Sequence, residues 1–220
     1  SKATAYVPLI AAHISEPSGP EHFVPLLQRL QPHGADYYAD GSAVLEGGNP
    51  RDLEFTAVQT QFSHIGSRRA EYIKYLSSLK HWELWDLMRA EDTSASCSVA
   101  AVPNRSGEQC RKRLMGCPSS FAALTVDELI DDDPQYGLCG GGALSQVYCP
   151  ESEGLHMATI DESNAFTYII VPRWWWPYQA GPRVRARELP EGFVRGRWSP
   201  STWLRPCYTR LAMGHTHAVY

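Results

Sequence analysis

The chain has 220 residues, 43% of them hydrophobic and 20% charged, and its formal net charge is −4. These values are those of an ordinary soluble globular protein with room for one large domain or two small ones. The sequence has no apolar run of about 18 residues and no signal-peptide pattern, so we expect no membrane span and an intracellular protein, cytoplasmic or nuclear and not secreted.

Charge is distributed unevenly along the chain. Acidic residues concentrate between Asp127 and Asp133, whereas the segment from Arg173 to Arg210 is rich in arginine and has only Glu188 and Glu191 as carboxylates. The negative total therefore leaves room for a basic surface.

The cysteines predict neither a disulfide framework nor a zinc site. A chain of this size without a signal peptide does not need disulfides, so we expect reduced thiols. No C-x-x-C or H-x-x-x-H pair occurs, and His215 and His217 form the only close histidine pair, which disfavours structural zinc. The six cysteines are Cys97, Cys110, Cys117, Cys139, Cys149 and Cys207.

Residues 1–66 are expected to form an N-terminal extension to which no chemistry can be assigned. Within it, Glu21 to Leu30 places apolar residues on one helical face and predicts a helix. Tyr37 to Leu45 contains an Asp-Gly turn between two apolar pieces and predicts a hairpin. After the extension, Ser67 to Ala90 keeps the 3.6-residue period and predicts a long helix whose aromatic stripe faces a core.

The segment from Ser98 to Met115 predicts a β-hairpin. An apolar strand leads into a polar turn with Gly107, and the return strand begins with three consecutive cations. Two interpretations remain open: a mobile basic finger suited to a polyphosphate or a nucleic-acid backbone, and a solvated surface hairpin.

The next segment contains a capping-box pattern and a glycine cluster. Thr125 to Asp131 predicts a short helix, because Glu128 follows Thr125 by three residues. The glycines from Gly137 to Gly142 match neither G-x-G-x-x-G nor the Walker pattern, so we reject a nucleotide P-loop and interpret them as a tight turn.

The stretch from Leu155 to Val171 (LHMATIDESNAFTYIIV) predicts a buried strand that carries Asp161 to its end and then turns sharply. A carboxylate at the end of a buried strand requires a metal, a cation or a hydrogen-bond donor. The alternative is a helix cap or a turn residue ahead of Asn164.

An aromatic cluster, Arg173 to Pro177 (RWWWP), follows. It suits either a base-stacking platform or burial against the hairpin, and we expect burial. The chain then ends, from Tyr208 to Tyr220, with a predicted short strand, a turn at Gly214 and the first turn of a helix.

In their order along the chain these segments resemble the fingers and palm of a reverse transcriptase, over roughly residues 98–220. The family begins with a fingers hairpin of the form K-x-x-G-x-x-R-x-L, whose place is taken by Asn104 to Leu114 (NRSGEQCRKRL). A connecting helix of the form P-x-I-D-x-L-L-D follows, and Val126 to Asp131 (VDELID) is similar to it.

Two palm motifs complete the resemblance. The first is an apolar strand followed by D-x-x-x-A-F/Y, to which Ile160 to Phe166 (IDESNAF) is similar. The second is a strand followed by L-P-x-G and a helix, to which Arg210 to Val219 (RLAMGHTHAV) is similar, with Ala212 in the proline position. Dinoflagellate retroelement-like sequences carry comparable GGGALS and RLAMG stretches.

The resemblance implies an α+β fold, with an antiparallel sheet packed on helices and residues 67–220 forming the fingers and part of the palm. It also implies chemistry by two divalent ions, Mg²⁺ or Mn²⁺, held about 4 Å apart. Asp161 would be the catalytic carboxylate and metal ligand from the first palm strand, helped by the main-chain carbonyl of Glu162.

The implied substrate contacts come from both ends of the resemblance. Lys112, with Arg111 or Arg113, would reach the triphosphate from the fingers. Phe166 matches the family's aromatic gate, which packs against the sugar of the incoming nucleotide.

In the second palm motif, Met213 and Gly214 would lie beside the templating base pair, because a glycine lets the backbone approach closely. The implied partners are an RNA or DNA template-primer and a deoxynucleoside triphosphate.

The departures from the family pattern are specific. The third palm motif, Y/F-x-D-D, does not occur in the sequence, and Asp131 to Asp133 precede the first motif and cannot replace it. Gly116 stands where the family usually has an acidic residue. We therefore expect the two metal ions to bind only together with aspartates further downstream. The chain as given is expected to be inactive as a polymerase.

Two other functions were weighed. One is a non-catalytic module, derived from a retroelement, that holds nucleic acid or an acidic protein through Arg111, Arg113, Arg183, Arg185 and Arg187. The other is a cysteine hydrolase using His156, which is disfavoured because no cysteine and histidine stand in a recognisable setting.

Overall fold

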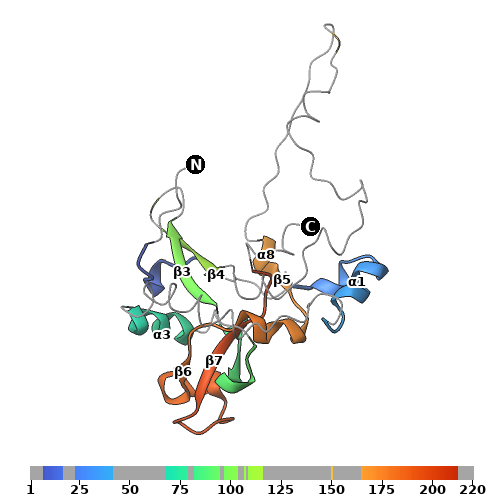
Figure 1. Cartoon of the computed structure of the whole chain (residues 1–220). Helices are drawn as coiled ribbons and strands as arrows, with labels where there is room; N and C mark the ends of the chain where they lie inside the picture. Colours follow the sequence, from blue (N-terminus) through green and yellow to red (C-terminus); the bar gives the residue numbers. More distant parts are fainter. Residues whose placement is uncertain are drawn as a thin grey trace.

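The computed structural model describes residues 7–16, 23–41, 68–78, 82–94, 97–103, 107, 109–115, 150 and 165–212. Over these residues the protein is a mixture of helices and strands with two antiparallel sheets and one short parallel strand pair (Figure 1). The predicted α+β class is confirmed at this coarse level. No helix in the described part of the chain is both long and apolar enough to cross a membrane.

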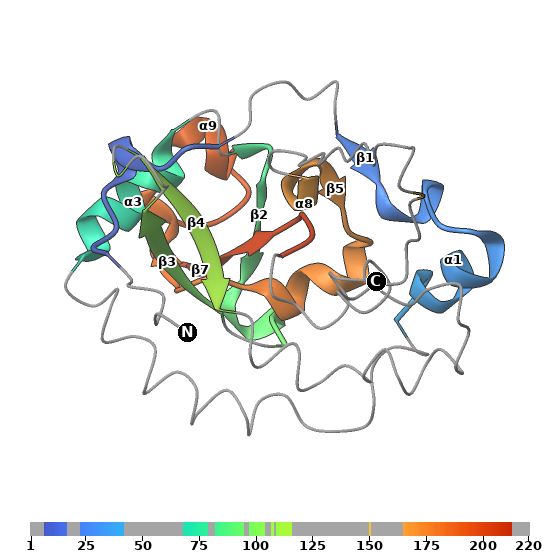
Figure 2. The same cartoon turned by 90° about the horizontal axis from the view of Figure 1, so that it is seen from above.

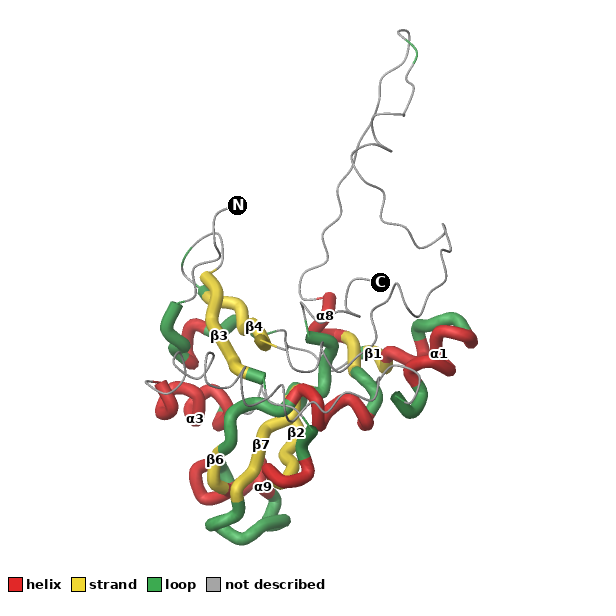
Figure 3. The backbone as a smooth tube through the Cα atoms, viewed as in Figure 1, coloured by secondary structure: helices red, strands yellow, loops and turns green. Residues whose placement is uncertain are grey.

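The larger sheet has three antiparallel strands in the order β2-β7-β6, with β7 in the middle (Figure 3). In its register, Trp85 lies opposite Tyr208 and Leu87 opposite Pro206. Trp85 and Leu87 are both buried, because alternate residues of a strand point to the same face. The strands are β2 (Trp85–Arg89), β6 (Val184–Arg185) and β7 (Trp203–Tyr208).

The predicted hairpin is confirmed as β3 (Ser98–Pro103) paired with β4 (Cys110–Met115). Its inner face, formed by Val99, Ala101 and Leu114, is buried in the main core. Figure 2 shows the hairpin lying across β7. The hairpin therefore packs its inner face against the rest of the protein, which neither interpretation of the segment included.

The N-terminal segments join the same structure. Residues 7–16, which contain the 3₁₀ turn η1 (Ala11–His13), contact both strands of the hairpin through bridges of Val7 to Ala101 and of Ile14 to Cys110. Farther along, β1 (Val24–Pro25) pairs in parallel with β5 (Ile169–Ile170). Parts of the predicted N-terminal extension thus pack with residues 67–220.

The predicted long helix of residues 67–90 is wrong beyond its first turns. α3 (Arg69–Ser77) buries Tyr72, Tyr75 and Leu76, and then ends at Ser77. The chain turns and continues as strand β2. Apolar residues in this stretch fit both the helical and the alternating period, and pairing with β7 selects the strand.

The helix predicted for Glu21 to Leu30 is also wrong. β1 and the 3₁₀ turn η3 (Leu26–Gln28) occupy the part of that stretch that the structure describes. A helix, α1 (Pro32–Tyr38), follows instead, with Pro32 in its first turn, where proline is tolerated. Since α1 continues through Tyr38, the first two residues of the hairpin predicted from Tyr37 are helical.

The tryptophan cluster lies in η7 (Arg173–Gln179), after α8 (Ala165–Tyr168) and β5. Trp175 is buried with Val171 and Leu211 in a second, smaller core. Its ring stacks on Tyr38 of α1, with 5.9 Å between the ring centroids. Burial of this residue is confirmed, but it packs against α1 and not against the hairpin.

Three short elements complete the described structure: η5 (Ala90–Asp92), η8 (Ala186–Glu188) and α9 (Glu191–Val194). Phe193 of α9 stacks on Trp82, with 5.5 Å between the ring centroids, and ties α9 to the main core. The cysteines of the described segments, Cys97, Cys110 and Cys207, are buried and form no disulfide with one another. The helix predicted at residues 125–131, the glycine turn and the strand before Asp161 lie outside the described residues.

Gly41 and Gly107 both have a positive φ, but only Gly41 is also closely packed. Gly41 (φ +83°) packs so closely on Trp174 that an added Cβ would lie 2.5 Å from a ring carbon. Gly107 (φ +75°) has open space around it.

We expect Gly107→Ala to cost about 1 kcal/mol of unfolding free energy and Gly41→Ala about 3 kcal/mol or more, measured by urea denaturation. Equal losses in the two variants would contradict the packing of Gly41 on Trp174.

Candidate functional site

Tyr208, at the end of β7, is the point where three segments distant in sequence meet. Its ring is buried, and its hydroxyl donates to Oγ1 of Thr167 in α8 over 3.4 Å. The Lys112 ammonium of the hairpin lies 4.3 Å from the centre of the same ring. The hairpin, the helical turn that follows residues 161–164 and the strand that precedes Leu211 are therefore in direct contact.

The chain after β7 runs beside β5. The backbone N–H of Leu211 donates to the carbonyl of Ile169 over 2.9 Å, and that of Val171 donates to the carbonyl of Thr209 over 3.1 Å. The buried amide of Gln179 donates to the carbonyls of Tyr208 and Arg210, each over 3.0 Å. These bonds fix the residues that immediately precede Met213 against those that follow Asp161.

Lys112 belongs to a buried polar network. Its Nζ lies 2.7 Å from Oε1 of Glu16, and the exposed fractions of the two side chains are 6% and 3%. The Tyr75 hydroxyl donates to the same carboxylate oxygen over 2.7 Å, and the Trp85 indole N–H donates to Tyr75 over 3.0 Å. The Glu16 carboxylate thus has both a cation and a hydroxyl donor, as a buried charge requires.

The network changes how its members titrate. Burial alone lowers the pKa of Lys112, but the neighbouring Tyr208 and the Glu16 carboxylate outweigh burial and raise it above the ordinary 10.5. Burial, followed by the charge of Glu16, raises the pKa of the Tyr75 hydroxyl well above its ordinary value. At neutral pH the network therefore holds a charged Lys112 and a neutral Tyr75 phenol.

The fingers residues fall on different faces of β4. Lys112 faces inward, and its ammonium is paired with the buried Glu16 carboxylate. The expectation that this ammonium reaches a triphosphate therefore does not fit this structure. Arg111 is exposed on the strand, as a substrate-binding cation requires. Arg113 belongs to the same strand, but its side chain lies outside what the structure describes.

Among the palm residues, Phe166 is half-buried in α8 and packs against the smaller core. Asp161, Glu162, Met213 and Gly214 lie outside the described residues. In the described segments no group of three His, Cys, Asp or Glu side chains is placed to hold a metal ion.

A second cluster of cations surrounds Trp203 at the start of β7. The guanidinium carbons of Arg185, Arg183 and Arg69 lie 4.2 Å, 4.8 Å and 6.0 Å from the centre of its ring. Glu188 pairs with Arg69 over 2.6 Å and also accepts from the backbone N–H of Arg185. We name Arg69, Arg183, Arg185 and Trp203 the Trp203 surface.

Glu188 is the carboxylate that organises the Trp203 surface. Burial opposes its ionisation, but the N–H of Arg185 and the guanidinium of Arg69 outweigh burial and hold the pKa of its carboxyl below the ordinary value. The carboxylate therefore remains charged and neutralises only part of the surface. Arg183 and Arg187 are exposed and have no ion-pair partner in the described segments.

Sequence reasoning named Arg183 and Arg185 but missed Glu16, Arg69 and Trp203. The spacing of Arg183 and Arg185 on either side of Val184 was a usable signal, since in extended chain it places both side chains on one face. Glu16 carries no local signal, because its partner Lys112 is 96 residues away.

Comparisons of the chain with models of protein families, with curated protein sequences and with solved structures found no match.

We expect Lys112→Met to destabilise the protein by about 3–5 kcal/mol, because the variant leaves the Glu16 carboxylate buried without a cation. The double variant Glu16→Gln/Lys112→Met removes both charges and keeps an acceptor for Tyr75, so it should lose only about 1 kcal/mol. Urea denaturation measures both losses. Similar losses in the single and the double variant would show that the two side chains do not act as a charged pair.

The same comparison has a pH dependence. Because folding raises the pKa of Lys112, its contribution is complete below the ordinary value of 10.5 and is lost as the pH rises through the folded pKa. The stability difference between the wild type and Lys112→Met should stay constant from about pH 7 to about pH 10 and narrow above that range. A difference that widens above about pH 10 instead would contradict the raised pKa.

Proposed function

We propose that this chain carries the fingers hairpin and the first two palm motifs of an RNA-directed DNA polymerase. The observation that carries the proposal is the meeting at Tyr208. The sequence resemblance concerns three segments separated by many residues, and each of them contributes or adjoins a contact of this one side chain.

The order of elements around the second palm motif also supports the proposal. In the resemblance that motif begins with a strand, and β7 (Trp203–Tyr208) ends just before Leu211. β5 follows the first palm motif, and Ile170 forms an antiparallel bridge with Arg210. The described residues that follow the first motif therefore lie beside those that begin the second.

In the proposed reaction, Asp161 supplies one metal ligand and Glu162 a main-chain carbonyl. When bound together with ligands further downstream, two such ions would supply activation of the primer hydroxyl and charge neutralisation of the incoming triphosphate. Arg111 is the exposed fingers cation in the described segments that remains for the phosphates, since Lys112 is paired with Glu16. The substrates are a template-primer and a deoxynucleoside triphosphate, and the ions are Mg²⁺ or Mn²⁺.

The metal site can be tested with paramagnetic Mn²⁺, which broadens the NMR signals of nearby nuclei. We expect titration to broaden the amide signals of residues 165–168 in the wild type and not in Asp161→Asn, because the neutral amide binds a divalent ion poorly. Glu162→Gln is the matched control, because the proposal uses only its main-chain carbonyl. Equal broadening in the wild type and Asp161→Asn would refute the metal site.

A second function, nucleic-acid binding without catalysis, is favoured by the Trp203 surface. Guanidinium groups stacked on an indole are held in place and keep N–H donors free for phosphates. Arg183 lies over Trp203 and has no carboxylate partner in the described part of the chain. This surface would contact a nucleic-acid backbone irrespective of base sequence.

Salt dependence tests this second function. The affinity for an RNA–DNA duplex should fall with salt at a slope of several units, and Arg183→Gln should reduce that slope by roughly one unit, as expected for one lost phosphate contact. Arg29→Gln removes an exposed arginine from another element and serves as the control. A flat salt response, or the same reduction in both variants, would count against the Trp203 surface.

A further inference from the structure

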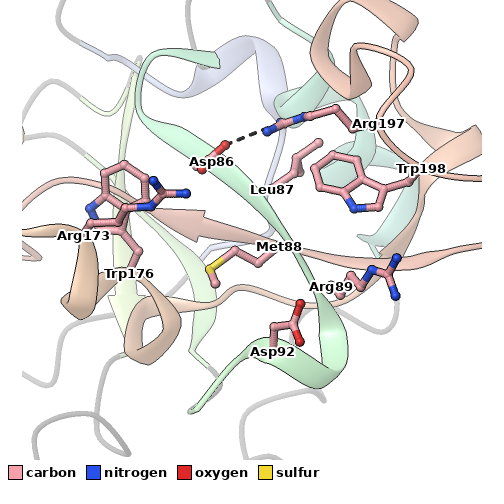
Figure 4. Close-up of a pocket in the computed structure, with 9 residues that line it drawn as sticks. All are labelled: Asp86, Leu87, Met88, Arg89, Asp92, Arg173, Trp176, Arg197 and Trp198. Carbon is pink, nitrogen blue, oxygen red and sulfur yellow. Dashed lines mark ion pairs between the residues drawn. The ribbon is translucent and has the colours of Figure 1, made fainter.

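A pocket of about 240 Å³ opens along β2 and involves none of the residues that the polymerase resemblance singles out. Figure 4 shows Arg173 and Trp176 of η7 on one side of β2, and Arg197 and Trp198 on the other. Met88 lies between the two groups, and Asp92 of η5 stands at the lower end of the view. The pocket thus combines two indoles with groups of both charges.

The Trp176 indole is held in place before any ligand arrives. Its N–H donates to the carbonyl of Val171 over 3.0 Å, and part of the ring packs against the smaller core. The other two tryptophans of η7 have other contacts. Trp175 is buried, and the indole N–H of Trp174 donates to the carbonyl of Tyr38 over 2.8 Å. Of the three, Trp176 is the one that lines the pocket.

The opposite wall of the pocket contains an ion pair between Arg197 and Asp86. Arg197 lies 3.6 Å from Asp86 and stacks on Trp198, with its guanidinium carbon 4.3 Å from the ring centre. Trp198 in turn packs against the main core. This wall therefore supplies shape and little net charge.

Two charged groups in the pocket lack an ionic partner. Within the described segments, Arg173 has no carboxylate at ion-pair distance, and its guanidinium lies 6.0 Å from the Trp176 ring centre. Asp92 likewise has no cation at ion-pair distance in the described segments. As far as the described residues show, the pocket offers a guanidinium without an ion-pair partner beside an aromatic face, and a carboxylate without one.

We propose that this pocket binds one nucleotide unit, with its base against Trp176, its phosphate at Arg173 and the N–H groups of the base directed to Asp92. Aromatic rings stack on any base, and a guanidinium matches the oxygens of a phosphate in a bidentate manner. A carboxylate only accepts hydrogen bonds, so it prefers a base edge with two adjacent donors, which is the edge of guanine. The volume of about 240 Å³ lies below the roughly 300 Å³ at which pockets that enclose a drug-sized ligand begin, so the pocket would cover part of a nucleotide and leave the rest outside.

The same chemistry is offered by a free guanosine monophosphate and by one guanosine nucleotide of a single strand. The proposal depends neither on the polymerase motifs nor on the Trp203 surface, because it uses other residues. Its failure would leave both of those proposals standing.

NMR titration with 5′-GMP tests the pocket. The indole N–H signal of Trp176, assigned with Trp176→Phe, should shift on addition of 5′-GMP. Arg173→Gln should weaken binding about tenfold, corresponding to the loss of a charge-assisted contact. Asp92→Asn should remove the preference for 5′-GMP over 5′-CMP, because its amide offers one acceptor and two donors.

Arg195→Asn is the matched control, because Arg195 is exposed outside the pocket and asparagine tolerates its positive φ of 56°. It should bind 5′-GMP like the wild type. The proposal is overturned if the Trp176 signal does not shift, or if Arg195→Asn weakens binding as much as Arg173→Gln does.

A single-stranded TTGTT pentamer distinguishes the two sources of the nucleotide. Binding at least tenfold tighter than 5′-GMP, lost with Arg173→Gln, would support recognition of a strand. Equal or weaker binding of the pentamer, with 5′-GMP still bound, would support a free nucleotide. Spectra of each variant without ligand show whether its fold is retained.

Discussion

The buried ion pair between Lys112 and Glu16 is the constraint on which the arrangement of this protein depends. It joins the hairpin to the segment of residues 7–16, and through Tyr75 and Trp85 it reaches α3 and β2. A charged pair so far from water is tolerated only when both charges are satisfied together. These four parts of the chain must therefore be placed correctly at the same time.

The same pair decides which cations of the hairpin remain for a ligand. Side chains alternate between the two faces of a strand, so the three consecutive cations of β4 cannot all point outward. Lys112 is directed into the core and neutralised, whereas Arg111 is exposed. The basic character that made the hairpin conspicuous in the sequence is thus divided between a structural role and a surface role.

The three tryptophans of η7 divide their roles in a similar way. Trp175 fills the smaller core, Trp174 anchors α1 through a hydrogen bond and covers Gly41, and Trp176 forms a wall of a pocket. The two interpretations of the tryptophan cluster, a stacking platform and a part of the core, therefore apply to individual tryptophans and not to the cluster as a whole. With Trp203 and its arginines, the aromatic residues of the C-terminal half combine packing with exposed, cation-lined surfaces.

The sequence by itself determined the elements whose signals are local. The hairpin was predicted at its observed strands, because an apolar run, a polar turn with Gly107 and a return run are all encoded within it. The mixed helix and strand class followed from the same patterns. The tertiary structure alone decided that residues 85–89 form a strand, because their apolar spacing fits two periods and pairing with β7 selects one. It alone brought Glu16 to Lys112 and Arg69 to Trp203, because partners 96 and more residues apart leave no mark on the local sequence.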